Sequence, residues 1–242
     1  MIGHVPHDGY SVITLDRPER ANALDAEHCD GIRAALTAAL DAGDRAVVLT
    51  GVGRAFSAGA DFGGVTDDGF SEAHYGMLHA IVDAPIPVVA AVNGHAIGAG
   101  MQLAIACDLR VVAEAASFAI PTARLGLAVD PWTIERLAGL VGGGPARRIL
   151  MTCDRVNAGD PALAPLIDRW GGLDDACDLA SDLATMAPLT LSYIKTTLNA
   201  WSRGDQQSTT ATAAFRAVWD SDDSREGLRA QRDGRSPTFS GR

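Results

Sequence analysis

Two turns rich in glycine and alanine are the parts of this sequence best suited to hold a reacting carbonyl group. They are SAGAD at residues 57–61 and NGHAIGAG at residues 93–100. Each follows an apolar segment that predicts a strand and precedes a predicted helix, whose first turn has unpaired N–H groups. Glycine lets the backbone approach a ligand closely. Two N–H groups aimed at one point would form an oxyanion hole for an acyl carbonyl. The alternative is that these small residues serve packing alone.

The hydrophobic periodicity predicts the elements that must position these turns. Strands are predicted over residues 10–16, 45–50, 87–92 and 108–113. Helices are predicted over residues 26–42 (after an N-cap at Asp25), 72–82, 98–106, 132–140, 145–151, 174–186, 188–201 and 209–232. Short strands alternating with helices indicate parallel βαβ units, and the final run of helices indicates a separate layer or an oligomerisation arm.

Composition excludes several classes of protein. The 242 residues carry 30 acidic and 20 basic side chains, and the net charge of −10 argues against nucleic-acid binding. The four cysteines have no CxxC spacing and no neighbouring histidine pair, so neither a metal site nor a disulfide framework is indicated. Residues 84–106 lack charged side chains, but Pro85, Pro87 and the glycines favour a strand, a turn and a helix over a membrane span. We expect a cytoplasmic protein.

Four motifs, in this order along the chain, resemble those of the crotonase (enoyl-CoA hydratase/isomerase) superfamily. They are LDRPERANAL at 15–24, AFSAGAD at 55–61, VAAVNGHAIGAGMQLAIACDL at 89–109 and RLAGLVGGGPARRILMT at 136–152. The nearest likeness is to mycobacterial enoyl-CoA hydratase-like acyl-CoA-binding proteins that lack the hydratase glutamates. The resemblance implies an α/β fold: a spiral of ββα units over residues 1–185 that holds an acyl-CoA site, then a helical region at 186–242 that assembles trimers or hexamers.

The same resemblance implies where a CoA thioester would bind. The backbone N–H groups of Ala60 and Ala99 would hold the thioester oxygen, and coenzyme A would be part of the ligand, with no further cofactor and no metal. The residues expected along the CoA moiety are Ala21, Ala23, Leu24, Ala58 and Asp61, with Arg17 and Arg20 as candidates for the phosphates. A surface arginine without a partner is the alternative for each. The residues expected to line an acyl tunnel, or simply the core, are Phe62, Phe70, Met77, Leu78, Ile81 and Trp132.

The sequence departs from the hydratase pattern at two positions. Hydratases of this superfamily hold a water between two glutamates, and this chain has Gln102 and Thr122 at those positions. An amide or a hydroxyl can hold a water, but neither accepts a proton near neutral pH. Loss of one general acid–base group costs roughly 10²–10⁴ in rate. We therefore expect hydratase activity to be weak or absent.

Asp130 is the remaining acid near the expected site. Other members of the superfamily place an aspartate in this loop as a base or a nucleophile. Asp130 also directly precedes Pro131, which is the arrangement of a helix N-cap followed by proline at the first helical position. Both interpretations stay open. His79 and His95 lie in segments near the expected pocket, but neither has a readable nucleophile partner, so packing or surface roles are favoured.

Three functions are consistent with these residues. The first is a protein that binds fatty acyl-CoA or enoyl-CoA thioesters in fatty-acid metabolism and carries them to lipid-synthesis enzymes. The second is an active enoyl-CoA hydratase/isomerase-type enzyme that uses Asp130 as acid and base. The third is a residual hydratase that works through a water held by Gln102 and Thr122. The sequence leaves open whether the protein is an enzyme.

Overall fold

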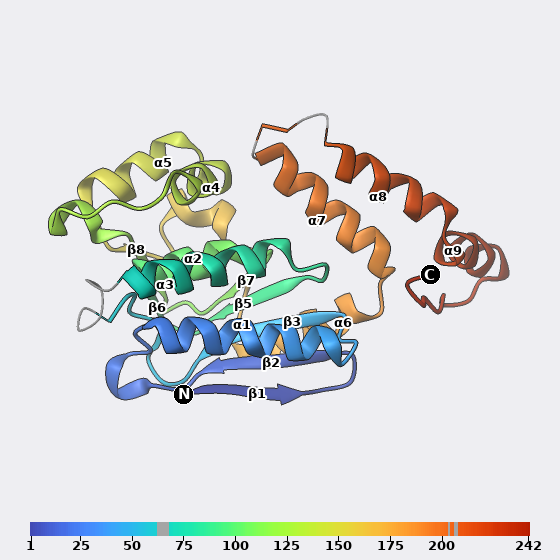
Figure 1. Cartoon of the computed structure of the whole chain (residues 1–242), viewed down its shortest axis with the longest axis horizontal. Coiled ribbons are helices and arrows are strands. Elements are labelled where there is room, and N and C mark those ends of the chain that lie inside the picture. The colour runs from blue at the N-terminus through green and yellow to red at the C-terminus, as the bar shows by residue number, and fades with distance from the viewer. Residues whose placement is uncertain (62–67, 203, 206–207) are drawn as a thin grey trace.

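Two sheets form the centre of the molecule in the computed structural model, which describes residues 1–61, 68–202, 204–205 and 208–242 (Figure 1). The larger sheet has the strand order β1-β2-β3-β5-β7-β10. Its strands are β1 (Ile2–Pro6), β2 (Tyr10–Leu15), β3 (Ala46–Gly51), β5 (Val88–Val92), β7 (Leu109–Val112) and β10 (Arg169–Trp170). Strands β1 and β2 pair antiparallel, and the remaining neighbours pair parallel, as the alternation of strands and helices predicts.

The smaller sheet has the order β4-β6-β8-β9. Its strands are β4 (Ala55–Ser57), β6 (His95–Ile97), β8 (Ser117–Ala119) and β9 (Val156–Asn157). Along the chain, each of β3, β5 and β7 in the larger sheet is followed by β4, β6 or β8 in the smaller sheet, and then by a helix. This repeat is the expected spiral of ββα units. The sequence did not predict the smaller sheet because strands of two or three residues are too short to show a period of two.

The helices mostly agree with the predicted segments. They are α1 (Ala26–Asp41), α2 (Asp68–Asp83), α3 (Ala99–Ala106), α4 (Pro131–Val141), α5 (Gly143–Arg147), α6 (Leu173–Ala184), α7 (Pro188–Ser202), α8 (Thr209–Asp220) and α9 (Asp222–Asp233). The single helix predicted over 209–232 is wrong. Ser221 has extended backbone angles and its hydroxyl accepts from the N–H of Ser224, so one residue ends α8 and caps α9.

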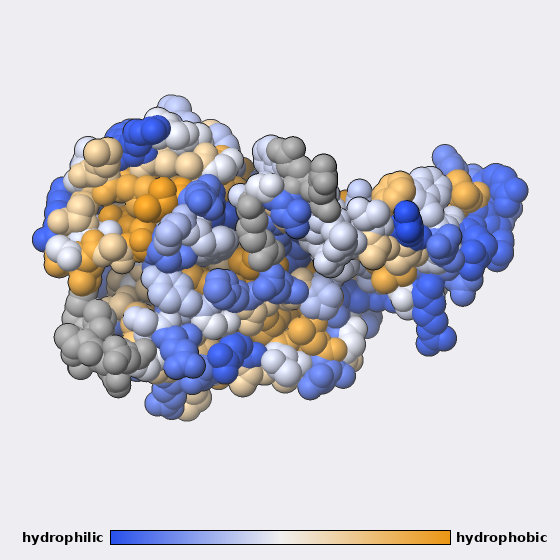
Figure 2. Space-filling view, turned by 45° about the horizontal axis from the view of Figure 1, so that its top comes forward, coloured by the Kyte–Doolittle hydropathy of each residue, from blue (hydrophilic) through white to orange (hydrophobic). Residues whose placement is uncertain are grey.

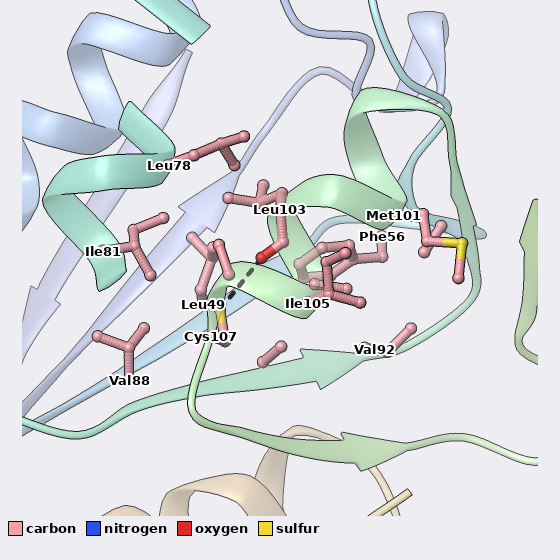
Figure 3. Close-up of a cluster of buried hydrophobic side chains, with 14 of the residues drawn as sticks. Leu49, Phe56, Leu78, Ile81, Val88, Val92, Met101, Leu103, Ile105 and Cys107 are labelled. Atoms are coloured by element: carbon pink, nitrogen blue, oxygen red, sulfur yellow. Dashed lines mark hydrogen bonds between the residues drawn. The ribbon is translucent and has the colours of Figure 1, made fainter. Parts of the chain in front are cut away.

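The main core lies between the larger sheet and the helices α1, α2 and α3. Figure 3 shows side chains of β3, β5, α2 and α3 meeting there, among them Leu49, Leu78 and Leu103. All eight residues of α3 are buried. Burial on every side explains why residues 99–106 carry no charge. No helix in the described part of the chain is long and apolar enough to cross a membrane.

Helix α7 is attached to the core by the only lysine of the sequence. The buried Lys195 Nζ donates to the carbonyl oxygens of Ile81 and Ile86 at 2.9 and 3.0 Å and forms an ion pair with Asp108 at 2.7 Å. Asn199, one turn later, donates to the carbonyl of Val82. Beyond α7, the helices α8 and α9 extend away from the two sheets as an arm (Figure 1).

Candidate functional site

The two glycine-rich turns lie directly against each other. A Cβ atom on Gly100 would stand 2.2 Å from the carbonyl oxygen of Ser57, and one on Gly59 would stand 2.7 Å from that of Ile97. Gly59 also has a φ of +99°, which other residues rarely adopt. Backbone therefore packs on backbone here, and only glycine fits at both positions.

This contact brings together the two N–H groups that the sequence singled out. The nitrogen of Ala99 would lie 3.4 Å from a Cβ placed on Gly59, the residue before Ala60. Ala99 is the first residue of α3, where an N–H has no partner within the helix. Within the described residues, neither the Ala60 N–H nor the Ala99 N–H donates to a protein group. Two backbone N–H groups that donate to no described residue thus belong to the contact between the two turns.

The loop at residues 17–25 pairs with the first turn through backbone hydrogen bonds. Ala58 N–H donates to the carbonyl of Ala21 at 2.9 Å, Leu24 N–H donates to that of Gly59 at 2.8 Å, and Asp61 N–H donates to that of Leu24 at 2.7 Å. The structure therefore brings together the residues that the family resemblance placed along the CoA moiety. The buried Asn22 side chain ties this loop to the segment that precedes the first turn, because it donates to the carbonyls of Val52 and Ala55.

Arg17 and Arg20 differ in their surroundings. The Arg17 guanidinium forms ion pairs with Asp61 at 2.9 Å and with Asp25 at 3.2 Å, so the alternative of a partnerless surface arginine is wrong for Arg17. Burial would raise the pKa of Asp25, but the hydrogen bonds from His28 and the charges of His28 and Arg17 outweigh burial and lower this pKa. Asp25 also caps α1, as predicted, by accepting from the His28 N–H. Arg20 is exposed, and its contact with a phosphate stays a prediction.

A second cluster, built from side chains, lies one helical turn further along α3. We call it the Gln102 network; its members are His74 of α2, Gln102 of α3, and Asp130 and Thr133 at the start of α4. Gln102 Nε2 donates to Thr133 Oγ1 at 2.8 Å and to Asp130 Oδ1 at 3.4 Å. Gln102 Oε1 lies 3.2 Å from His74 Nε2. His74, Gln102 and Thr133 are only 3%, 5% and 0% exposed.

The network sets the proton positions on His74. Because Gln102 Oε1 can only accept, His74 Nε2 must carry the hydrogen, and Nδ1 is left with a lone pair. Burial lowers the pKa of His74, and the opposing effects of Gln102 and Asp130 are smaller, so the ring is neutral. Tyr75 lies beside the network, and burial, followed by the charge of Asp130, raises its pKa.

Asp130 occupies the predicted N-cap position of α4, with Pro131 at the first helical position, but its side chain makes no capping hydrogen bond. The prediction of the position is confirmed, and that of the cap bond is wrong. The carboxylate Oδ1 accepts instead from the hydroxyl of Thr133 and from the amide of Gln102. Two side-chain donors from different elements thus replace the backbone N–H groups of the helix.

The chain is similar to known proteins along nearly its whole length. The model of the enoyl-CoA hydratase/isomerase family matches residues 7–242. The chain belongs to the enoyl-CoA hydratase/isomerase family. It is 41% identical over 245 residues, covering the full length of both chains, to the "Probable enoyl-CoA hydratase echA6" of Mycobacterium tuberculosis. It is 34% identical over 247 residues to the carnitinyl-CoA dehydratase of Salmonella enteritidis, with 95% of this chain and 94% of that protein covered.

Solved structures agree with this membership. An enoyl-CoA hydratase/carnithine racemase from Magnetospirillum magneticum superposes with a TM-score of 0.90 at 25% identity, covering 100% of this chain and 96% of that one. An enoyl-CoA hydratase from Mycobacterium tuberculosis H37Rv superposes with a TM-score of 0.86 at 27% identity, covering 100% and 99%. The expected crotonase-like α/β fold is confirmed, and the family places the protein in acyl-CoA metabolism.

Two further predicted residues, Thr122 and Trp132, do not join the Gln102 network. Thr122 stands in the 3₁₀ turn Pro121–Leu125, and its side chain makes no hydrogen bond to any described residue, including Gln102. Trp132 is half-buried and packs against the main core. Phe62 lies outside the described residues.

The sequence missed His74 and emphasised the wrong histidines. His79 is exposed, as the surface interpretation predicts. His95 does have a hydroxyl partner that the sequence did not reveal, Ser117 Oγ at 2.9 Å from Nδ1. The signal for His74 was present, because it lies four residues after Phe70 and three before Met77, on the same apolar stripe of α2. Its partners come from α3 and α4, far away in the sequence.

Proposed function

We propose that this protein binds fatty acyl-CoA or enoyl-CoA thioesters through the backbone N–H groups of Ala60 and Ala99, and that it carries them toward lipid synthesis with little or no hydration. The observation that carries this proposal is the hydrogen bonding of the Gln102 amide. Gln102 replaces the first hydratase glutamate, and both ends of its amide are already hydrogen-bonded within the protein. No separate cofactor is required, because coenzyme A is part of the ligand.

The bonded amide argues against hydration for two reasons. An amide does not accept a proton near neutral pH, so Gln102 cannot act as a general base. In addition, its oxygen accepts from His74, and its nitrogen donates to Thr133 and Asp130, so few groups remain to orient a water. Thr122 at the second position has no carboxylate either. Loss of both groups predicts a rate lower by roughly 10⁴ or more, since each contributes roughly 10²–10⁴.

Binding does not depend on those glutamates. The N–H donors at Ala60 and Ala99 belong to the backbone, and their spacing follows from the close contact of Gly59 and Gly100 with the opposite turn. An N–H on alanine donates as well as one on glycine. A donor pair of this kind stabilises partial negative charge on a thioester oxygen whether or not a reaction follows. The site can therefore keep its ligand after losing its chemistry.

The C-terminal helices support a proposed trimer or hexamer. The large apolar side chains exposed on α7 and α8 are Ile194, Leu198, Trp201, Phe215 and Trp219. Figure 2 shows apolar surface along the arm formed by α8 and α9, beside strongly hydrophilic surface at its tip. Assembly with further copies would cover these side chains. Light scattering coupled to gel filtration should give a mass of three or six chains, and a monomer would contradict this part of the proposal.

A paired measurement tests the function. Calorimetry with acyl-CoAs from C4 to C18 should show binding, while the ultraviolet absorbance of crotonyl-CoA should fall far more slowly than with a two-glutamate hydratase. Coenzyme A alone is the control for the contribution of the thioester. Turnover within tenfold of an ordinary hydratase would overturn the proposal, and so would affinities equal to that of free coenzyme A.

Restoring the glutamates is the converse test. The double variant Gln102→Glu, Thr122→Glu should gain measurable hydration of crotonyl-CoA. Because residue 102 lies beside Asp130, the new carboxylate would be repelled, and a triple variant with Asp130→Asn removes that repulsion. The matched control is Thr122→Glu alone, which supplies only one of the two groups. Folded double and triple variants that bind crotonyl-CoA but leave it unchanged would contradict the assignment of these positions.

A further inference from the structure

We propose that this protein docks on anionic lipid surfaces through the exposed face around the 3₁₀ turn Pro121–Leu125. We call this surface the turn face. Its members are the exposed apolar side chains of Leu125, Leu127 and Met151 and the exposed arginines Arg124, Arg147 and Arg155. The inference goes beyond the proposed function and does not depend on it, because docking on lipid involves no CoA thioester.

The apolar members of the turn face stand far out into water. Leu125, Leu127 and Met151 are 50%, 45% and 76% exposed, and every residue from 123 to 128 is exposed. Figure 2 shows hydrophobic side chains gathered at the end of the molecule that carries α4 and α5. Apolar side chains grouped on a surface gain free energy when a partner removes them from water. The turn face therefore calls for a partner with an apolar layer.

Hydrogen bonds hold the turn face in shape before any partner arrives. The 3₁₀ turn ends at Gly126, whose φ is +68°, and the N–H groups of Gly126 and Leu127 both donate to the carbonyl of Thr122. The Arg124 guanidinium donates to the carbonyl of Thr152 at 3.0 Å. This bond joins the 3₁₀ turn to the π turn Arg148–Thr152, which carries Met151. Ordering these turns on binding would therefore cost little entropy.

Charge on this part of the chain has the opposite sign to the rest. Residues 121–155 contain five arginines and three carboxylates, a net charge of +2, whereas the remainder of the chain carries −12. Beyond about 10 Å at moderate salt, the acidic remainder is screened. An anionic surface would thus attract the protein only when the turn face approaches it, and this sets the orientation of docking.

The carboxylates of this segment do not cancel the arginines of the turn face. Asp154 pairs with Arg148, and Asp130 accepts within the Gln102 network. Glu135 lines the cavity between α4 and α7.

Three cations are left over. Arg124, Arg147 and Arg155 are exposed, and none of them forms an ion pair with a described residue. Each is available to a negatively charged partner.

The arrangement of the two kinds of side chain favours lipid over an acidic protein. Arg124 directly precedes Leu125, and Arg147 lies four residues before Met151. A cation beside a protruding apolar side chain suits an interface in which the charge stays among headgroups and the apolar group enters the acyl boundary. A lipid surface accepts such side chains without a complementary shape, which a folded protein would have to supply.

The experiment is co-sedimentation of the full chain with vesicles, in the absence of any acyl-CoA. One set contains equal parts of phosphatidylglycerol and phosphatidylcholine, and the other contains phosphatidylcholine alone. The protein should bind the anionic vesicles at about 50 mM salt, and at least tenfold more weakly to the neutral vesicles or at about 0.5 M salt. Absence of binding to the anionic vesicles would overturn the inference and leave an acidic protein as the partner of this face.

A triple variant tests the cations. One arginine near an anionic lipid surface strengthens binding roughly fivefold, so Arg124→Gln, Arg147→Gln, Arg155→Gln together should weaken it on the order of 100-fold. The matched control replaces three exposed arginines elsewhere that form no ion pair with a described residue: Arg169→Gln, Arg216→Gln and Arg232→Gln. Both proteins have the same net charge, and the control should bind nearly as the native protein does. Equal losses in the two variants would refute the turn face as the docking site.

A second triple variant tests the apolar contacts. Leu125→Ser, Leu127→Ser, Met151→Ser should weaken binding to the anionic vesicles at least tenfold, because the side chains that enter the acyl boundary are lost. The control removes the same three side-chain types from other exposed positions: Leu173→Ser, Met186→Ser and Leu228→Ser. Native affinity in the turn-face variant would mean that charge alone holds the protein, and it would overturn docking into lipid.

The outcomes also separate this inference from the proposed function. If the protein sediments with anionic vesicles but binds no acyl-CoA more tightly than coenzyme A, only the proposed function fails. If acyl-CoA binds in calorimetry and the vesicles do not bind, only the role of the turn face fails.

Discussion

The two halves of the site are built in different ways. The turns at residues 57–61 and 97–100 are a contact of backbone on backbone, in which glycines at positions 59 and 100 allow carbonyl oxygens to approach. The Gln102 network is a contact of side chain on side chain between α2, α3 and α4. The backbone contact supplies N–H groups, which every residue except proline has. The Gln102 network supplies side-chain groups, which a single amino-acid substitution can remove.

Under the proposed function, this difference explains how a family member can keep a ligand and lose a reaction. In that proposal, Gln102 and Thr122 stand in place of the hydratase glutamates, and this replacement changes the side-chain half only. The backbone half follows from the packing of β4, β6 and α3, and it is unaffected by which residue stands at position 102. Binding and chemistry can therefore be perturbed separately, and the largest losses should come from the backbone half.

The largest expected effect comes from Gly100→Ala. The new Cβ would lie 2.2 Å from the Ser57 carbonyl, so the two turns must separate. We expect a loss of about 3 kcal/mol in the free energy of unfolding, the upper end of the usual cost of overpacking, and loss of acyl-CoA binding. Urea denaturation and calorimetry measure both. The control is Gly139→Ala in α4, where nothing lies within 4 Å, and which should be neutral or slightly stabilising. Normal stability and binding in Gly100→Ala would refute the close contact.

The next largest effect is expected from Ala99→Pro. Proline is tolerated at the first helical position, so this change removes one N–H with little distortion of α3. A hydrogen bond to the polarised but neutral thioester oxygen contributes up to about 1.5 kcal/mol, so acyl-CoA affinity should fall about tenfold. Calorimetry with free coenzyme A serves as the control and should be unchanged. Unaltered acyl-CoA affinity in a folded variant would show that the thioester oxygen is held elsewhere.

A smaller effect is expected in the side-chain half from Thr133→Val. This fully buried hydroxyl accepts from Gln102 and donates to Asp130, and valine leaves both groups without that partner. We expect a loss of about 1–3 kcal/mol in the free energy of unfolding. Saturated acyl-CoA should still bind, because the backbone donors are unaffected. Thr133→Ser keeps the hydroxyl and is the matched control. A loss of binding as large as that of Ala99→Pro would mean that the two halves are not separable.

The smallest effect concerns pH. Burial lowers the pKa of His74 in the folded protein, whereas the unfolded chain has the ordinary histidine value of about 6.5. Above that pH both states are neutral and His74 makes no difference to the pH dependence. As the pH falls below about 6.5, the unfolded state takes up the proton first, so stability falls, by no more than about 1.4 kcal/mol per pH unit. His74→Gln should remove this part of the decline between pH 7 and pH 5. Parallel stability curves for the two proteins would contradict a buried, neutral His74.

The sequence by itself determined the longer elements and the backbone half of the site. Periodicity located α1, with Asp25 as its cap, and the strands β2, β3, β5 and β7, because these segments are long enough to show a period. The motifs of the crotonase superfamily located both turns. These features are local, since a glycine-rich turn between a strand and a helix depends on consecutive residues. Even Gln102 and Thr122, which the resemblance sets at the positions of the hydratase glutamates, can be read directly from the sequence.

Only the tertiary structure decided the side-chain half. Its members lie at positions 74, 102, 130 and 133, and their hydrogen bonds join three helices that no local pattern relates. Asp130 shows the reason most clearly, because the sequence correctly predicted its place before α4 but not its partners. A capping bond depends on the residues that follow, whereas the bond from Gln102 depends on how α3 packs against α4. Packing is a property of the whole chain, and it is packing that leaves Nδ1 of His74 buried and without a donor among the described residues.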